Sequence, residues 1–440
     1  MGLALPAAWL RGVGLDVRVH DLSIDRLPDD ALAGVSLLAV SLPMHTATRL
    51  ALPVIAELRR RLPHAPICAY GLYAPLNDAR LREAGATHVF GPECERDLVA
   101  LALETSMPGS VASVASSTSA TVTAAVRRGR SATVPDRQGL PALERYAQLM
   151  WPDGHVSVVG AVEATRGCKH LCRHCPVVPI YQGRFHAVPV EVVLADIRAQ
   201  VALGAAHITF ADPDFFNGPT HAARLIDALH HEWPALTYDV TIKVEHLRRH
   251  DALLPRLRDT GCAFVTSAVE SLDDQVLLAL DKGHTRADVV AVAARCHALG
   301  LVLSPTFVAF TPWTTLNGYL EFLDDVDAMG LVDHVAPVQW TLRLLVTQDS
   351  GLLALDDIRS VVGPYNPATL THPWTHADER VDALQRDLMQ SAGVSQGRAR
   401  RATFDAIRAR AAADVAGAPG PRPVLVSRSS IPYLTEPWYC

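Results

Sequence analysis

Lysine is nearly absent from this chain of 440 residues and occurs only at Lys169, Lys243 and Lys282. Arginine supplies the other basic side chains, and the formal net charge is -6. A chain of this charge has no field that would attract a polyanion, so we expect no nucleic-acid partner. Because arginine replaces lysine almost everywhere else, the three remaining lysines mark positions of interest, with chance surface placement as the alternative.

The sequence also lacks a long apolar run. No segment approaches the ~20 apolar residues that a membrane helix needs, and residues 1–14 lack the basic start and apolar stretch of a signal peptide. We therefore expect a cytoplasmic protein with no membrane partner. Its eight cysteines, in such a chain, do not form a disulfide framework.

Strand and helix patterns alternate through residues 1–104. The predicted helices are 3–14, 47–62, 77–84 and 94–103, and the predicted strands are 17–20, 35–41, 67–70 and 88–90. This order predicts an α/β domain of the doubly wound, Rossmann-like kind. The domain opens on a helix, so either its first strand is missing or the native chain begins upstream of Met1. Residues 105–135 are rich in Ser, Thr and Ala and predict a flexible linker, with an ordered irregular segment as the alternative.

The alternation resumes in residues 150–350. The predicted strands are 156–164, 207–211, 237–242, 264–269, 301–309 and 335–345, and the predicted helices include 190–203, 222–230 and 287–299. Six βα units predict a partial (β/α)6 barrel of the TIM type, in which ligands bind at the carboxyl ends of the strands. Residues 351–440 predict a mostly helical C-terminal region, with helices near 376–391 and 398–415 and a tail that ends at Cys440.

Three cysteines follow the first predicted barrel strand in the segment Cys168-Lys-His-Leu-Cys172-Arg-His-Cys175. Three thiolates within eight residues can wrap one small inorganic cluster, and iron–sulfur clusters usually take four such ligands. No fourth cysteine is nearby, so one iron would stay open to chelate another molecule. The alternative is a non-catalytic protein, either an electron carrier or a zinc module in which His170 or His174 is the fourth ligand.

The spacing Cys-x3-Cys-x2-Cys after the first strand of a partial barrel resembles the signature of radical S-adenosylmethionine (SAM) enzymes, over residues 160–345. The resemblance implies that Cys168, Cys172 and Cys175 bind a 4Fe-4S cluster whose fourth iron chelates SAM. It also implies an electron donor such as flavodoxin or ferredoxin, and cleavage of SAM to an organic radical. The chain departs from the family at His174, where an aromatic residue is usual.

The same resemblance implies SAM contacts at the ends of the next two strands. Asp212 or Asp214 would hold the SAM amino group, with a helix N-cap as the alternative role. Lys243 and Glu245 would meet the SAM carboxylate and ribose, with an ordinary surface ion pair as the alternative.

At the end of the fourth barrel strand, Glu270 and Ser271 resemble the family's Gly-x-Glu-Ser segment. In that segment the glutamate and the serine contact SAM. A plain capping role is the alternative.

The N-terminal domain resembles the cobalamin-binding domain of cobalamin-dependent radical SAM enzymes. Met44 and His45 follow a predicted strand at the edge where doubly wound sheets bind ligands, so they are the candidate cobalamin contacts. The chain has no Asp-x-His-x-x-Gly motif to supply an axial histidine. A remnant domain used only for packing is the alternative.

The tail from Ile431 to Cys440 resembles a radical SAM group whose chains end in Cys-(selenocysteine or Cys)-Ala-Glu-Pro. This implies a selenoprotein candidate whose native chain extends past Cys440, with Cys440 as a candidate catalytic thiol; an accidental terminal cysteine is the alternative. A related group moves the 3-amino-3-carboxypropyl group of SAM to arsenic. We therefore expect a transferase or lyase that modifies a small molecule, including carbon–heteroatom bond formation in specialised or metalloid metabolism, with cobalamin-dependent methylation as the alternative.

Overall fold

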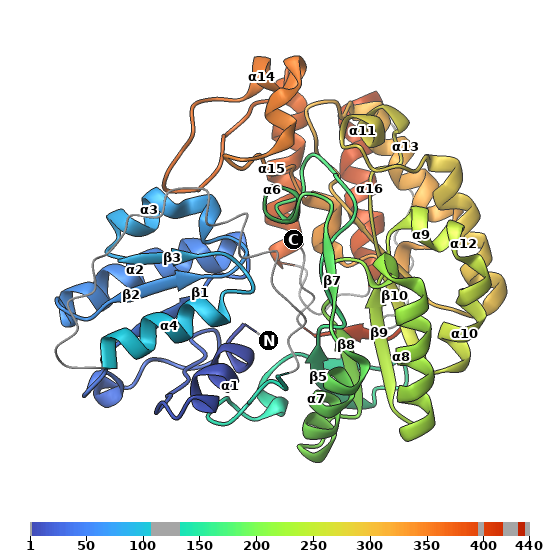
Figure 1. Cartoon of the computed structure of the whole chain (residues 1–440). Coiled ribbons are helices and arrows are strands. Elements are labelled where there is room, and N and C mark those ends of the chain that lie inside the picture. The colour runs from blue at the N-terminus through green and yellow to red at the C-terminus, as the bar shows by residue number, and fades with distance from the viewer. Residues whose placement is uncertain (1, 107–132, 395–399, 417–429, 436–440) are drawn as a thin grey trace.

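The computed structural model describes residues 2–106, 133–394, 400–416 and 430–435. Most of the predicted linker 105–135 lies outside these ranges, and so does the tail thiol Cys440. Within them, no helix has the length and apolar character needed to cross a bilayer. Figure 1 shows the N-terminal domain beside the barrel, with the segment around α14 (Asp356–Val361) reaching from the barrel side toward it.

The N-terminal domain is a three-layer α/β unit. Its parallel sheet has the order β1 (Leu38–Ser41), β2 (Ile67–Tyr70) and β3 (His88–Phe90). The helices are α1 (Ala4–Gly12), α2 (His45–Arg61), α3 (Asp78–Glu83) and α4 (Glu95–Ser106). Alternate residues of β2 face opposite layers: Ile67 packs in the cluster with α2 and α3, whereas Cys68 packs in the cluster with α1 and α4. The prediction of helices on both faces of a parallel sheet is confirmed.

The predicted strand 17–20 is wrong, because residues 15–20 pair with no strand. Val17 packs against the cluster between α1 and α4, so its apolar side chain is partly buried without backbone pairing. The Arg18 guanidinium donates to the carbonyls of Ala31 and Ala33 at 3.2 and 2.8 Å and ties the segment to the following turn. The apolar residues that predicted a strand therefore serve side-chain packing and not sheet pairing.

The second sheet has seven strands in the order β11-β10-β9-β8-β5-β4-β12. Five of them are parallel: β5 (Val156–Val162), β8 (His207–Phe210), β9 (Thr237–Thr241), β10 (Cys262–Glu270) and β11 (Leu303–Phe307). The antiparallel strands β4 (Gln148–Met150) and β12 (Tyr433–Leu434) extend the β5 edge. Tyr433 and Leu434 thus pair with β4, which lies between them and the first strand of the barrel.

Helices cover this sheet and separate its strands along the chain. They are α7 (Val190–Ala202), α8 (Pro219–Glu232), α9 (Val244–Arg249), α10 (Leu254–Asp259), α11 (Asp274–Ala279), α12 (Arg286–Leu299) and α13 (Leu316–Ala328). The C-terminal region adds α14, α15 (Glu379–Val394) and α16 (Arg400–Ala416), which confirms a helical extension. Trp340 is fully buried and stacks edge-on against Phe404 of α16, with ring centroids 5.2 Å apart.

The predicted sixth barrel strand at 335–345 is wrong. This segment contains the 3-10 helix Pro337–Thr341 and contributes one isolated parallel bridge, from Arg343 to Phe310. The Gln339 side chain accepts the Phe307 backbone N–H at 2.7 Å, so a side chain takes the place of a strand neighbour. Pro337 has no N–H to offer a ladder. The result is a curled half-barrel with five parallel strands among the described residues.

Candidate functional site

The three cysteines lie on one loop that follows β5. Within the loop, β6 (Thr165–Gly167) pairs antiparallel with β7 (Phe185–Ala187), and α6 (Val177–Tyr181) lies between them. Cys172 is buried, Cys168 and Cys175 are partly buried, and all three are free thiols. The loop therefore holds three unmodified sulfur ligands at the carboxyl edge of the half-barrel.

The spacing of the three sulfurs bears on what they can bind. Among the described residues, the one group that brings three His, Cys, Asp or Glu ligand atoms within 4.8 Å of one another is His170, Asp214 and His246. The cysteine sulfurs are therefore spread more widely than that. A single zinc ion, with Zn–S bonds of about 2.3 Å, needs sulfurs about 3.8 Å apart. In the described residues the three cysteines are therefore not arranged as a preformed zinc site.

Burial raises the pKa of the Cys168 thiol to about 11 and that of Cys175 to about 12, and the neighbouring thiols add to both shifts. Lys243 lowers the pKa of Cys168, and Lys282 lowers that of Cys175, but burial outweighs them. Such thiols stay protonated until a metal displaces the proton. Three buried thiols with nearby lysines fit the ligand set of an iron–sulfur cluster.

All three lysines of the chain lie around this loop. Lys169 belongs to it, and its Nζ lies 3.4 Å from the Asn217 carbonyl. Lys243 follows β9 and is 8% exposed, while Lys282 follows α11 and is 3% exposed. A lysine is rarely this buried without a charged partner. The sparse lysine distribution in the sequence therefore did point to one place in the fold.

Glu270 lies at the end of β10 in a strained backbone conformation. Its φ is +71°, and the β10–β11 register shifts between Ala268 and Glu270. Its Oε1 lies 3.3 Å from Lys282 Nζ and 3.2 Å from His174 Nε2. Burial opposes ionisation of this carboxyl, but Lys282 and His174 outweigh it and hold the pKa at about 2. Strain of this kind persists where the surroundings over-determine it, which is typical of functional sites.

Lys243 and Glu245 form the predicted pair, with Nζ 3.5 Å from Oε2. Because Lys243 is buried, the alternative of a surface ion pair is wrong for it. Gly283 lies against this pair at a φ of +71°, and a Cβ there would lie 2.9 Å from Glu245 Oε2. The positive φ favours glycine here, and a Cβ would shift the carboxylate end of Glu245.

Asp212 and Asp214 both have engaged carboxylates. Asp212 accepts hydrogen bonds from the Ala164 N–H at 3.0 Å and the Thr165 hydroxyl at 2.5 Å, so it ties β8 to the start of the cysteine loop. Burial raises its pKa to about 7, although both hydrogen bonds favour the ionised form. Asp214 accepts the Phe216 N–H at 3.1 Å through Oδ1, which is the predicted N-cap role. Its other oxygen faces the two histidines described below.

Ser271 and the two candidate cobalamin residues have local partners. The Ser271 hydroxyl accepts the Asp273 N–H at 3.1 Å in a local turn, and Asp273 itself is the N-cap residue of α11. Met44 is the N-cap residue of α2, and its carbonyl accepts from Thr48. His45 Nε2 lies 2.7 Å from the Thr369 carbonyl of the C-terminal region, and burial lowers its pKa. The His45 ring is thus held by a segment more than three hundred residues away in the sequence.

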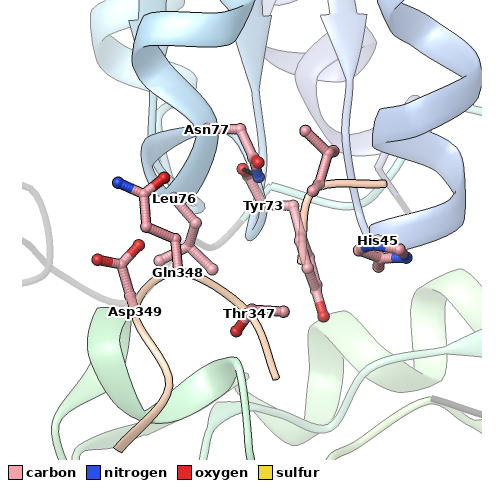
Figure 2. A pocket seen from close by; sticks show the side chains of 8 residues that line it. His45, Tyr73, Leu76, Asn77, Thr347, Gln348 and Asp349 are labelled. Carbon is pink, nitrogen blue, oxygen red and sulfur yellow. Dashed lines mark hydrogen bonds between the residues drawn. The ribbon is translucent and has the colours of Figure 1, made fainter. Parts of the chain in front are cut away.

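A small cavity lies between the N-terminal domain and the C-terminal region (Figure 2). Its enclosed volume is only about 10 Å³, room for roughly one water molecule. Figure 2 shows His45, Tyr73 and Asn77 from the N-terminal domain facing Thr347, Gln348 and Asp349. Sites for drug-sized ligands have volumes of about 300–1,000 Å³. In the described arrangement this cavity is therefore smaller than cobalamin requires.

The N-terminal domain also covers the cysteine loop directly. Leu72 and Leu76, which follow β2, pack in the same apolar cluster as Tyr181, Cys168 and Cys175. The Tyr181 hydroxyl donates to Glu93 Oε1 at 3.0 Å, and Arg166 lies 3.9 Å from Glu95. These contacts shield the apolar side of the loop from water.

The sequence interpretation missed the partners that complete the site. It treated His174 as a departure from the family, His170 as a zinc alternative and Lys282 as an isolated lysine, and it did not single out His246. The signal for Lys282 was its rarity. For His246, no sequence signal separates it from the other histidines, because its neighbours come from distant segments.

Residues 162–314 match the family model of the Radical SAM superfamily. This stretch contains the three cysteines, Lys243, Glu270 and Lys282. The central part of the chain is therefore a radical SAM domain.

Two curated relatives are similar over part of the chain. One is the tRNA-2-methylthio-N(6)-dimethylallyladenosine synthase of Methylococcus capsulatus, 25% identical over 203 residues, covering 43% of each chain. The other is the bacteriochlorophyllide d C-12(1)-methyltransferase of Chlorobaculum tepidum, 23% identical over 172 residues, covering 38% of this chain and 35% of that protein. The chain thus spans less than half the length of these relatives.

Two solved structures are similar over most of the described fold. The cobalamin-dependent SAM radical enzyme OxsB, with aqua-cobalamin and SAM bound, has a TM-score of 0.56 and 12% identity, covering 80% of this chain and 57% of that one. The radical SAM methyltransferase TsrM from Kitasatospora setae, with cobalamin and a [4Fe-4S] cluster bound, has a TM-score of 0.56 and 18% identity, covering 75% and 70%. At these identities the likeness shows the fold, an α/β domain followed by a half-barrel.

Proposed function

We propose that this chain is a radical SAM enzyme in which Cys168, Cys172 and Cys175 hold a 4Fe-4S cluster. One observation carries the proposal: three free thiols, one buried and two partly buried, lie on one loop at the carboxyl edge of a half-barrel, inside the segment that matches the superfamily. When bound, the cluster supplies the single electron that cleaves SAM, and a flavodoxin or ferredoxin is the proposed external donor.

The residues around the loop have separate proposed tasks. Lys243 and Lys282 offset the negative charge that three thiolates bring into a buried site. Glu270 stays ionised at neutral pH and, with Ser271, is a proposed SAM contact, since its strained backbone fixes its carboxylate at the strand end. Lys243 and Glu245 are the proposed contacts of the SAM carboxylate and ribose.

Asp212 and Asp214 support the site in another way. Both oxygens of Asp212 accept hydrogen bonds from Ala164 and Thr165, so its proposed role is to position the cysteine loop. Asp214 caps the turn after β8 and reaches the histidine of the loop. To contact the SAM amino group, Asp212 or Asp214 would have to give up one of the contacts just described.

The proposed substrate is a small molecule, in specialised or metalloid metabolism, that receives a group derived from SAM. The two curated relatives are named for methylthio and methyl transfer, which supports transfer chemistry in general. Carbon–heteroatom bond formation is the leading candidate because of the resemblance of the tail to a group that includes aminocarboxypropyl transfer. Cys440, the proposed reactive thiol of that tail, lies outside the described residues.

Cobalamin-dependent methylation is the second candidate function. The shared fold with two cobalamin-bound enzymes favours it. In the described arrangement, Leu72 and Leu76 contact the cysteine loop, and the neighbouring cavity has an enclosed volume of only about 10 Å³. Binding of cobalamin between the domains would therefore require them to separate.

Anaerobic reconstitution with iron and sulfide tests the proposal. The wild-type chain is expected to show 4Fe-4S absorption and to cleave SAM when reduced, and the Cys168→Ala, Cys172→Ala and Cys175→Ala variants are expected to lose both. The product assigns the reaction: 5'-deoxyadenosine, S-adenosylhomocysteine and methylthioadenosine report deoxyadenosyl chemistry, methylation and aminocarboxypropyl transfer, respectively. Tight zinc binding by the cysteines with SAM left intact would refute the proposal.

A further inference from the structure

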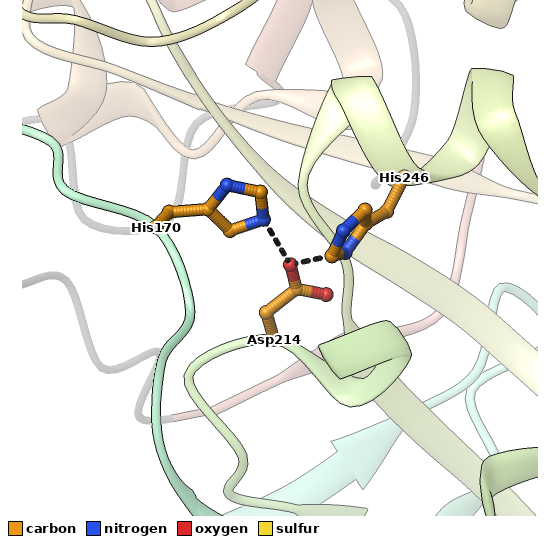
Figure 3. A group of neighbouring side chains, drawn as sticks. All are labelled: His170, Asp214 and His246. Atoms are coloured by element: carbon orange, nitrogen blue, oxygen red, sulfur yellow. Dashed lines mark ion pairs between the residues drawn. The ribbon is translucent and has the colours of Figure 1, made fainter. Parts of the chain in front are cut away.

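A second group of metal-type ligands lies beside the cysteine loop. Figure 3 shows His170, Asp214 and His246 turned toward a common point. His170 Nε2 lies 3.3 Å and His246 Nδ1 lies 2.6 Å from the same oxygen of Asp214. The three residues come from the cysteine loop, the turn after β8, and α9, so their convergence depends on the tertiary fold.

These ligand atoms are buried, and the histidines contact Asp214 as ion pairs without hydrogen-bond geometry. Asp214 is 1% exposed and His246 is fully buried. His170 Nε2, Asp214 Oδ2 and both ring nitrogens of His246 are buried without a hydrogen bond among the described residues. Since most buried polar atoms in proteins are hydrogen-bonded, a group of unsatisfied ones around one point indicates a missing ligand.

The surroundings orient these side chains as metal ligands are usually oriented. The Phe216 N–H holds Asp214 through Oδ1, which leaves Oδ2 free to face the histidines. On the far side of the His170 ring, Nδ1 lies 3.5 Å from Glu245 Oε2. A carboxylate on the outer nitrogen of a histidine fixes the ring so that its other nitrogen is presented to a metal.

We propose that His170, Asp214 and His246 bind a divalent transition-metal ion that is separate from the cysteine cluster. Two imidazoles and one carboxylate form a donor set used for zinc and for ferrous iron. Metal–ligand bonds of about 2.0–2.1 Å at a tetrahedral angle separate ligand atoms by about 3.3–3.4 Å. The His170–Asp214 separation already matches, and the His246–Asp214 separation would lengthen by less than ~1 Å.

This ion would bridge the cysteine loop to the ends of β8 and α9. It does not depend on the proposed SAM chemistry, because none of its three ligands is a cysteine. The chain also offers a matched control: His284 is buried, and both of its ring nitrogens likewise lack a hydrogen bond, but it has no place in the three-residue group.

The test uses the full-length chain with Cys168, Cys172 and Cys175 changed to Ser, so that no cluster iron interferes, and with folding checked by circular dichroism. After chelation, Co²⁺ is titrated and its visible d–d bands are followed; Zn²⁺ is then used as a competitor. We expect a single tight ion per chain, with affinity reduced at least ~10-fold in His246→Gln and Asp214→Asn and unchanged in His284→Gln.

A second measurement keeps the proposal testable if the cysteine-free chain does not fold. In the reconstituted wild type and His246→Gln, zinc and iron are counted by elemental analysis alongside the cluster absorption. We expect His246→Gln to lose the extra ion and to keep the cluster. A folded protein that binds no Co²⁺ or Zn²⁺, or that binds them equally well in all variants, would overturn the proposal, whereas failure of SAM cleavage alone would not.

Discussion

Gly167, the residue before the first cysteine, should be indispensable for holding the cysteine loop. Its φ is +79°, and a Cβ there would lie 2.5 Å from the Arg184 carbonyl and against the Tyr181 ring. Alanine costs about 1–2 kcal/mol in a left-handed conformation, and crowding in a packed site costs about 1–3 kcal/mol more. We therefore expect Gly167→Ala to destabilise the loop by about 2–5 kcal/mol.

Gly183 in the same loop provides a matched control. Its φ is +76°, but a Cβ there would meet Leu171 and the Lys169 carbonyl only at 3.4 and 3.5 Å, which is ordinary contact. Gly183→Ala should therefore carry the conformational cost alone, about 1–2 kcal/mol. The difference between the two variants isolates the steric effect.

The assay is the iron and sulfide content after anaerobic reconstitution, together with urea denaturation of each variant. Gly167→Ala is expected to retain a small fraction of the wild-type iron, and Gly183→Ala most of it. Equal iron retention in the two variants, or wild-type retention by Gly167→Ala, would refute the reasoning that close packing at residue 167 sets the geometry of the loop.

Three other expectations follow from buried groups. Burial lowers the pKa of His284 to about 4 in the folded chain. As the pH falls from about 6.5 to about 4, His284 is therefore protonated in the unfolded chain but not in the folded one, and the stability of the fold decreases. His284→Gln should reduce that acid loss by about 2 kcal/mol in urea denaturation at pH 4.5, and identical pH profiles would contradict this. Lys282→Met should destabilise by about 3–5 kcal/mol because it removes the lysine partner of buried Glu270 and leaves only His174 beside it. Adding Glu270→Gln should recover much of the loss; no recovery would argue against the pair. Leu72→Ser should speed bleaching of the reconstituted cluster in air, measured by absorption, whereas exposed Leu50→Ser should not; equal rates would rule out shielding by the N-terminal domain.

Much of the fold could be predicted because its signals are local. In the N-terminal domain, the apolar run 67–70 and the short strand 88–90 are found at the predicted positions. The segments 17–20 and 335–345 have the same apolar composition but do not form strands. In the first segment Val17 packs against the helices, and in the second the Gln339 side chain takes the hydrogen bond of a strand neighbour. Neither contact produces a periodic pattern in the sequence.

The sequence by itself determined the cysteine loop, because all its ligands lie within eight residues and their spacing needs no long-range contact. It also singled out Lys282, through the scarcity of lysine. Only the tertiary structure decided that Lys282 pairs with Glu270 and His174, and that His170 meets Asp214 and His246. The physical reason is that most of these contacts join segments dozens of residues apart in the chain, and burial of charge is a property of the assembled fold.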